Sequence, residues 1–209
     1  MSSWPNSVTR MTRSLRHRIA VFRRNLNQIG ANEIARRYFV LNAFDGALTI
    51  LGVVVGFAVS GEGSPRLVLS AGAGASLAMG ISGAVGAYMA ETAERGQQLQ
   101  ELEGHMFQSL EGTKMSRAIR QAALWVAFVD GISPAMAAAI PIIPFILVSR
   151  GIIIMEAGIA ASIVLDLATL FMLGVFLARV SGGNKWLRGF LMVGAGLVTA
   201  LVLLALDTL

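Results

Sequence analysis

Long apolar stretches dominate the pattern of hydrophobic and polar positions along the chain. Each stretch approaches the roughly 20 residues that a helix needs to cross the hydrocarbon core of a bilayer. The runs are continuously apolar rather than alternating, which favours helices over a barrel, because a helix satisfies its own backbone in lipid. The pattern therefore predicts an all-α, polytopic membrane protein with about five spans, at residues 38–59, 67–89, 122–148, 152–177 and 189–206.

Two polar segments accompany these spans. Residues 1–37 form a basic leader in which apolar residues recur three or four apart, at Val8, Met11, Leu15, Ile19, Phe22, Leu26 and Ile29. This spacing predicts an amphipathic helix that lies on the cytoplasmic membrane surface. A nucleic-acid-binding arm or a disordered tail would need no apolar stripe. Residues 91–120 are polar and also helical in period, so we expect a cytoplasmic extension of the second span that turns back into the third.

Composition agrees with a membrane protein and excludes several other classes. The chain is 55% hydrophobic and only 14% charged, which is too little charge for a soluble domain of this length. It has no cysteine, so disulfides and thiolate metal sites are excluded. Without a phosphate-binding loop or a nucleophile motif, the sequence predicts neither an enzyme nor a permanently bound cofactor.

The distribution of basic residues predicts the orientation. Of the 17 Lys and Arg residues, all but Arg66 and Arg150 lie in the leader, in residues 91–120 or after the fourth span. The positive-inside rule then places the N-terminus in the cytoplasm and Leu209 outside. The net charge of +5 therefore comes from basic residues that flank the spans at the membrane surface, and we expect no nucleic-acid partner.

Four carboxylates fall within or near the predicted spans: Asp45, Asp130, Glu156 and Asp166. A charge at a span centre costs about 2.5–3.5 kcal/mol on insertion scales. No Lys, Arg or His lies inside these spans, so a cation, a proton or water must compensate the acids. For Asp45 and Asp130 we favour ion or proton handling over protonated carboxyls that merely join helices. Glu156 lies near a span end and is best explained without a function, and for Asp166 both explanations stand.

Glycines and prolines qualify the helices around these acids. Asp45 and Asp130 are each followed by glycine, and Pro134, Pro141 and Pro144 predict an irregular third span of the kind that lines cavities in transporters. Small residues also recur four apart, at Gly72, Ser76 and Gly80 and at Gly52 and Gly56. Such faces permit close helix packing, within one chain or between two.

A second group of candidate ligands lies in the cytoplasmic connection. Glu91 and Glu94 are one turn apart at the cytoplasmic end of the second span, and Glu101 and His105 are four apart. Residues four apart share a helix face, so Glu101 and His105 could both ligate a first-row metal. The alternative is an ordinary solvated helix surface.

The run from Arg37 to Gly56, RYFVLNAFDGALTILGVVVG, resembles the first span of the vacuolar iron transporter family, which has an Asp-Gly followed by Thr and a Gly-Val-rich run. The likeness extends more loosely over residues 34 to 207. It implies a dimeric, five-span carrier that exports Fe²⁺ or Mn²⁺ from the cytoplasm in exchange for protons, from a divergent prokaryotic branch in the cell membrane. It places Asp45 on the ion path and implies metal gathering by Glu91, Glu94, Glu101, Glu103 and Glu111.

The chain departs from this family at the end of the second span. The family's Gly-Glu-Tyr reads Gly86-Ala87-Tyr88, and its nearby methionine is replaced by glycine. Asp130 is a candidate to supply the missing carboxylate. We therefore predict a divalent-metal carrier whose metal residues are Asp45, Asp130, Glu91, Glu94, Glu101 and His105. The alternative is a non-transporting membrane module that binds a partner through its cytoplasmic helices.

Overall fold

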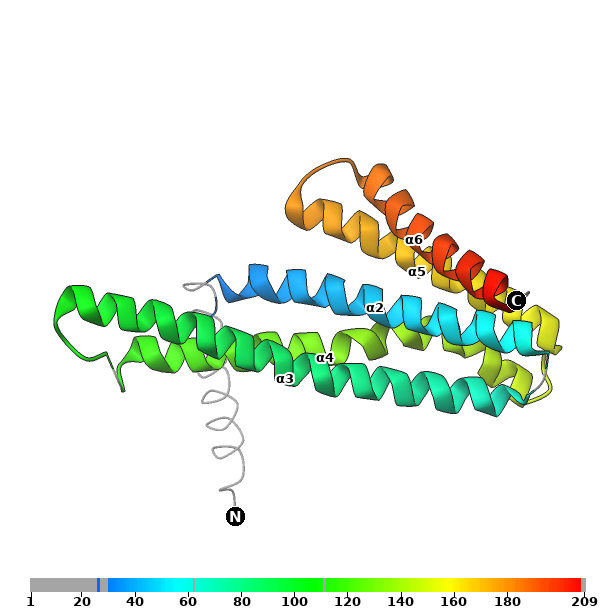
Figure 1. The fold of residues 1–209 in the computed structure, drawn as a ribbon, viewed down its shortest axis with the longest axis horizontal. Helices are drawn as coiled ribbons and strands as arrows, with labels where there is room; N and C mark the ends of the chain where they lie inside the picture. The colour runs from blue at the N-terminus through cyan, green and yellow to red at the C-terminus, as the bar shows by residue number, and fades with distance from the viewer. Residues whose placement is uncertain (1–25, 27–29, 62, 111, 208–209) are drawn as a thin grey trace, which may run out of the picture.

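The structure is a computed structural model that describes Leu26 and residues 30–61, 63–110 and 112–207. This part of the chain forms helices and no strands (Figure 1). In chain order the helices are α2 (Ala31–Ser60), α3 (Pro65–Met106), α4 (Lys114–Ser149), α5 (Met155–Ser181) and α6 (Lys185–Asp207). All five are long and apolar enough to cross a membrane. The prediction of an all-helical, polytopic membrane protein is confirmed.

Helices α3 and α4 extend well beyond the other three. At 1.5 Å per residue, the 42 residues of α3 span about 63 Å, roughly twice the thickness of a bilayer core. Figure 1 shows α3 and α4 side by side, continuing past the start of α2 before a short loop joins them. Residues 91–120 are thus the end of α3, a turn and the start of α4.

The bundle has one end to which most of the basic residues map, here called the basic end. It holds the start of α2 and the α3–α4 and α5–α6 connections (Figure 1). The charge distribution assigns this end to the cytoplasm, which stays a prediction. The predicted leader helix lies outside the described residues, apart from Leu26, which is buried against Ala31 and Ala122.

The core is built around α2, which contacts all four other helices. On one of its faces Ala43, Ala47 and Leu51 pack against Leu170 of α5 and Ala137 of α4. On α3 the small residues at positions 72, 76 and 80 are all buried. Their spacing therefore serves packing within the chain, rather than the contact between two chains that the sequence also allowed.

The third span keeps its helical form where irregularity was predicted. Helix α4 continues through Pro134, Pro141 and Pro144. A proline contributes no N–H, so the carbonyl four residues before it loses its helical donor. The prolines therefore leave carbonyls without a helical N–H donor in α4 and do not end the helix.

A polar seam between α2, α3 and α4

One face of α2 carries a row of polar side chains through the middle of the bundle. Tyr38, Asn42, Asp45 and Thr49 follow one another at spacings of four, three and four, which places them on one face of a helix. Thr49 Oγ1 donates to Met79 Sδ of α3 at 3.4 Å. The facing positions of α3 are Met79, Gly83, Ala87 and Glu91, also four apart. We call these residues, with Asp130 of α4, the polar seam.

Asp130 is the buried acid of this seam. Its side chain is 2% exposed, and its Oδ1 accepts a hydrogen bond from the Asn42 amide. Because residue 134 is proline, the backbone carbonyl of Asp130 has no helical donor, and it accepts from Ser133 Oγ at 2.7 Å instead. Both carbonyl and carboxylate are thus satisfied by side chains.

Gly83 makes room for the pair that Asn42 and Asp130 form. A Cβ at this position would lie 2.9 Å from Asp130 Oδ2 and 3.0 Å from Asn42 Nδ2. Both distances are shorter than normal contacts to carbon. Close packing continues at Gly46, whose Cβ would lie 2.7 Å from the Cα of Pro134. The three helices therefore approach one another closely around Asp130 because the residues between them are small.

Asp45 lies at the rim of the seam and is exposed on the single chain. It lies on the same face of α2 as Asn42, the hydrogen-bond partner of Asp130, and one turn further along the helix. On the same face of α2, Leu41 is 55% exposed, and no atom lies within 4 Å of a Cβ built on Gly56. Because a charge in lipid is costly, both Asp45 and Asp130 are expected to face protein or water. Asp130 does so by burial, and for Asp45 this stays a prediction about the assembled protein.

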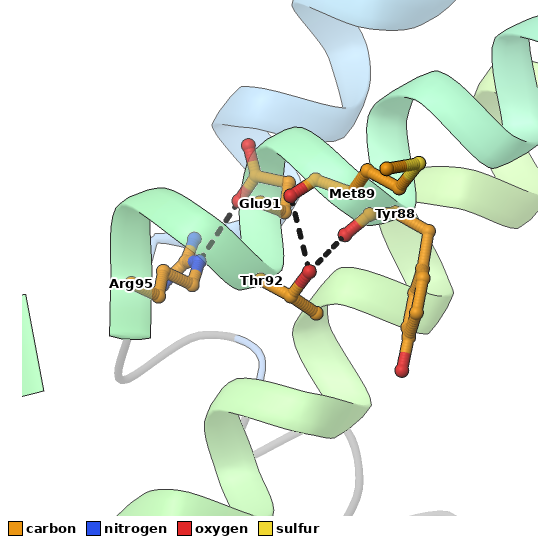
Figure 2. Close-up of polar contacts among 5 residues, drawn as sticks. All are labelled: Tyr88, Met89, Glu91, Thr92 and Arg95. Atoms are coloured by element: carbon orange, nitrogen blue, oxygen red, sulfur yellow. Dashed lines mark hydrogen bonds and ion pairs between the residues drawn. The ribbon is translucent and has the colours of Figure 1, made fainter. Parts of the chain in front are cut away.

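Glu91 closes the seam toward the basic end as an ion pair (Figure 2). Its Oε2 lies 2.8 Å from Arg95 Nε, and both residues are buried. Thr92, between them in sequence, donates its hydroxyl to the carbonyls of Tyr88 at 2.7 Å and Met89 at 3.1 Å. Glu91 is therefore neutralised by Arg95 rather than open for a metal in this arrangement.

The other predicted ligands are not brought together. Glu94, Glu101 and His105 are exposed on α3, and Glu103 accepts from the backbone N–H of Leu110 at 2.6 Å, which stabilises the α3–α4 turn. Among the described residues, no group of three or more His, Asp or Glu side chains could hold a metal. Glu111 lies outside the described residues.

The remaining two acids have opposite environments. Glu156 is exposed in the first turn of α5, whereas Asp166 is 1% exposed.

Sequence reasoning missed Asn42, Gly83 and Met79 as members of the seam. The row of polar residues at 38, 42, 45 and 49 was a signal that could have indicated Asn42.

Comparison with known proteins gives the family. The sequence model of the VIT family matches residues 36–106 and 100–206. An uncharacterized protein of Methanocaldococcus jannaschii, MJ0645, is 32% identical over 174 residues, which cover 81% of this chain and 87% of that protein. No solved structure matches the chain. The chain therefore belongs to the VIT family, a family of membrane metal-ion transporters.

Proposed function

We propose that this protein carries Fe²⁺ or Mn²⁺ out of the cytoplasm in exchange for protons, with Asp45 as the central metal ligand. The observation that supports this proposal is the polar seam. Asp130 is buried, and Asp45 lies one turn from Asn42, the partner of Asp130. Neither carboxylate has a Lys, Arg or His partner among the described residues. Uncompensated acids at membrane depth are costly and mark ion paths.

The exposure of Asp45 supports a homodimer as the working unit. A carboxylate at membrane depth is costly in lipid, so its surface needs a cover. A second copy related by a two-fold axis would present the same face, and the free space at Gly56 would allow two α2 helices to approach closely. Two Asp45 carboxylates would then flank one passage.

The donor set favours a first-row divalent metal as the transported ion. Carboxylates alone also suit Mg²⁺, whereas the thioether of Met79, one turn beyond Asp45, adds a softer donor. Without metal, two adjacent carboxylates repel, so the Asp45 pair holds one proton between them. Metal binding displaces that proton, which couples the two ions.

The alternative function is a membrane module that binds a partner through the α3–α4 extension. One observation favours it, since apolar side chains are exposed at the tip, with Phe107 97% and Met106 54% exposed. Exposed apolar groups of this kind mark interaction surfaces. The two functions differ in whether metal crosses the membrane.

Metal flux into proteoliposomes tests the proposal. The purified protein should move Fe²⁺ or Mn²⁺, and Asp45→Asn, which removes charge but little volume, should lower flux at least tenfold while leaving a folded dimer. Glu156→Gln is the matched control, because Glu156 is exposed at a helix end outside the seam. Wild-type protein that moves no metal would favour the alternative. Undiminished flux in Asp45→Asn would remove Asp45 from the mechanism.

A further inference from the structure

Asp166 is a buried acid in the middle of α5 that the polar seam does not include. Its side chain is 1% exposed, and neither Oδ1 nor Oδ2 has a hydrogen-bond partner. Its neighbours on the same helix face are satisfied: Ser162 donates to the Pro141 carbonyl at 2.6 Å and Thr169 donates to the Leu165 carbonyl at 2.8 Å. Buried polar groups nearly always have partners, so this exception needs an explanation.

The opposite helix offers an acceptor at the same level. The Ser162–Pro141 hydrogen bond fixes the level of α5 against α4, and the two helices run in opposite directions (Figure 1). Four residues along α5, Asp166 therefore lies at the level of Ala137. Because residue 141 is proline, the Ala137 carbonyl receives no N–H from it. A carboxylate cannot donate to a carbonyl, but a protonated Asp166 can.

Within the part of the chain that the structure describes, no ion pair or hydrogen bond compensates an ionised Asp166. Of the helices packed against α5, α2 presents Ala43, Ala47 and Leu51, which leaves Asp45 on its other face. On α4, Asp130 lies seven residues before Ala137, about 10 Å along the axis. The cations of α6, Lys185 and Arg188, lie at its start, at the basic end. Asp166 is therefore in an apolar environment that favours the neutral form.

An apolar cavity leads from the basic end toward Asp166. It has a volume of about 620 Å³ and lies between three helices. Its walls are Phe39 and Ala43 of α2, Met136, Ala137 and Ile140 of α4, and residues of α5 between Thr169 and Arg179. Its inner end, at Ala137 and Thr169, lies one turn from Asp166. Figure 1 shows α5 and α6 diverging from α2 toward the basic end. Side chains leave space there between α2, α4 and α5, and the rings of Phe39 and Phe176 meet edge to face across it, with centroids 6.0 Å apart.

We propose that Asp166 is a second proton-binding site of the transport cycle, which exchanges its proton with the basic end of the bundle through this cavity. In the arrangement described here Asp166 holds one proton. When the cavity widens, the O–H bond breaks, the proton passes to water and the carboxylate keeps the electron pair. The cycle is completed when a proton returns from water. This inference rests on the proposed metal–proton exchange and adds a site to it.

Infrared difference spectroscopy of the reconstituted full-length protein reads the protonation of Asp166 directly. Wild type should show the carbonyl stretch of a protonated carboxyl in an apolar environment, and this band should be absent in Asp166→Asn. The band should weaken when Mn²⁺ is added or when pH is raised. Failure to find it, or a band that neither Mn²⁺ nor pH alters, would overturn the proposal by making Asp166 ionised or permanently protonated.

The second measurement is the number of protons moved per Mn²⁺ ion, with dyes for both ions in the same proteoliposomes. Asp166→Asn should still move Mn²⁺ down its gradient but with one proton fewer per metal. Thr199→Val, which removes a hydroxyl that donates only within α6, to the Ala195 carbonyl at 3.0 Å, should keep the wild-type ratio. An unchanged ratio in Asp166→Asn would overturn the proposal. Wild-type protein that moves no Mn²⁺ would refute the proposed function instead, and the pH-dependent band would still decide whether Asp166 exchanges a proton.

Discussion

Asn42→Ala removes the only hydrogen bond described for the buried Asp130 carboxylate. The substitution deletes an amide and leaves an acceptor unsatisfied between α2, α3 and α4. An orphaned buried polar group costs about 1–3 kcal/mol, so the free energy of unfolding should fall by about that amount. In an Asp130→Ala background nothing is left unpaired, and the same substitution should cost much less. The difference is the coupling energy, and interhelical hydrogen bonds in membranes suggest about 0.6–1.7 kcal/mol.

Equilibrium unfolding in mixed micelles, followed by tryptophan fluorescence, measures the four members of this cycle. Trp125 lies in α4 near the seam and packs with Ala35 and Ala87, so its emission should report separation of these helices. Ser76→Ala is the control, because the Ser76 hydroxyl donates only within its own helix, to the Gly72 carbonyl at 2.7 Å. Equal costs for Asn42→Ala in the two backgrounds would refute the claim that this contact carries energy.

Two further substitutions test the close packing at Gly83 and the ion pair between Glu91 and Arg95. Gly83→Ala should displace Asn42 and Asp130, because its Cβ would lie about 3 Å from both polar ends; metal flux should fall severalfold, whereas Gly74→Ala, with no atom within 4 Å, should leave flux unchanged. Arg95→Ala should destabilise the fold by about 3–5 kcal/mol, because it leaves Glu91 buried without its cation. Replacing both residues by leucine should restore most of that loss in the same unfolding assay, and equal instability of single and double variants would contradict the ion pair.

The sequence predicted the spans well because a membrane helix is specified by its own apolar run. Hydropathy does not mark the polar parts of α3 and α4, but the helical period of residues 91–120 predicted that the second span continues as a helix and turns back into the third, as the structure shows. The pairing of Asn42 with Asp130 joins residues 88 positions apart, and it depends on the level at which α2 packs against α4. Periodicity within one helix cannot supply that level.

Glu91 illustrates the opposite case. Its partner Arg95 is four residues further along the same helix, a spacing that favours an ion pair and could have been read from the sequence. Treating Glu91 as a metal ligand ignored this local partner. In a helix, a cation four residues away from a candidate ligand competes with a metal for the same carboxylate.

Asp45 is exposed on the single chain and Asp166 is buried, and both would contribute to the charge balance of the proposed transport cycle. A divalent metal that binds between two Asp45 carboxylates brings two positive charges and displaces one proton. In the proposed dimer the empty Asp45 pair with one proton carries one negative charge, and the metal-loaded pair is neutral. Loading would therefore change the charge by one unit at membrane depth, where ionic interactions are weakly screened. Release of a proton from one of the two Asp166 carboxyls of the dimer would offset this change. One proton from each kind of site would then exchange for one divalent metal without net charge movement, whereas one proton from the Asp45 pair alone would leave the exchange to move one net charge.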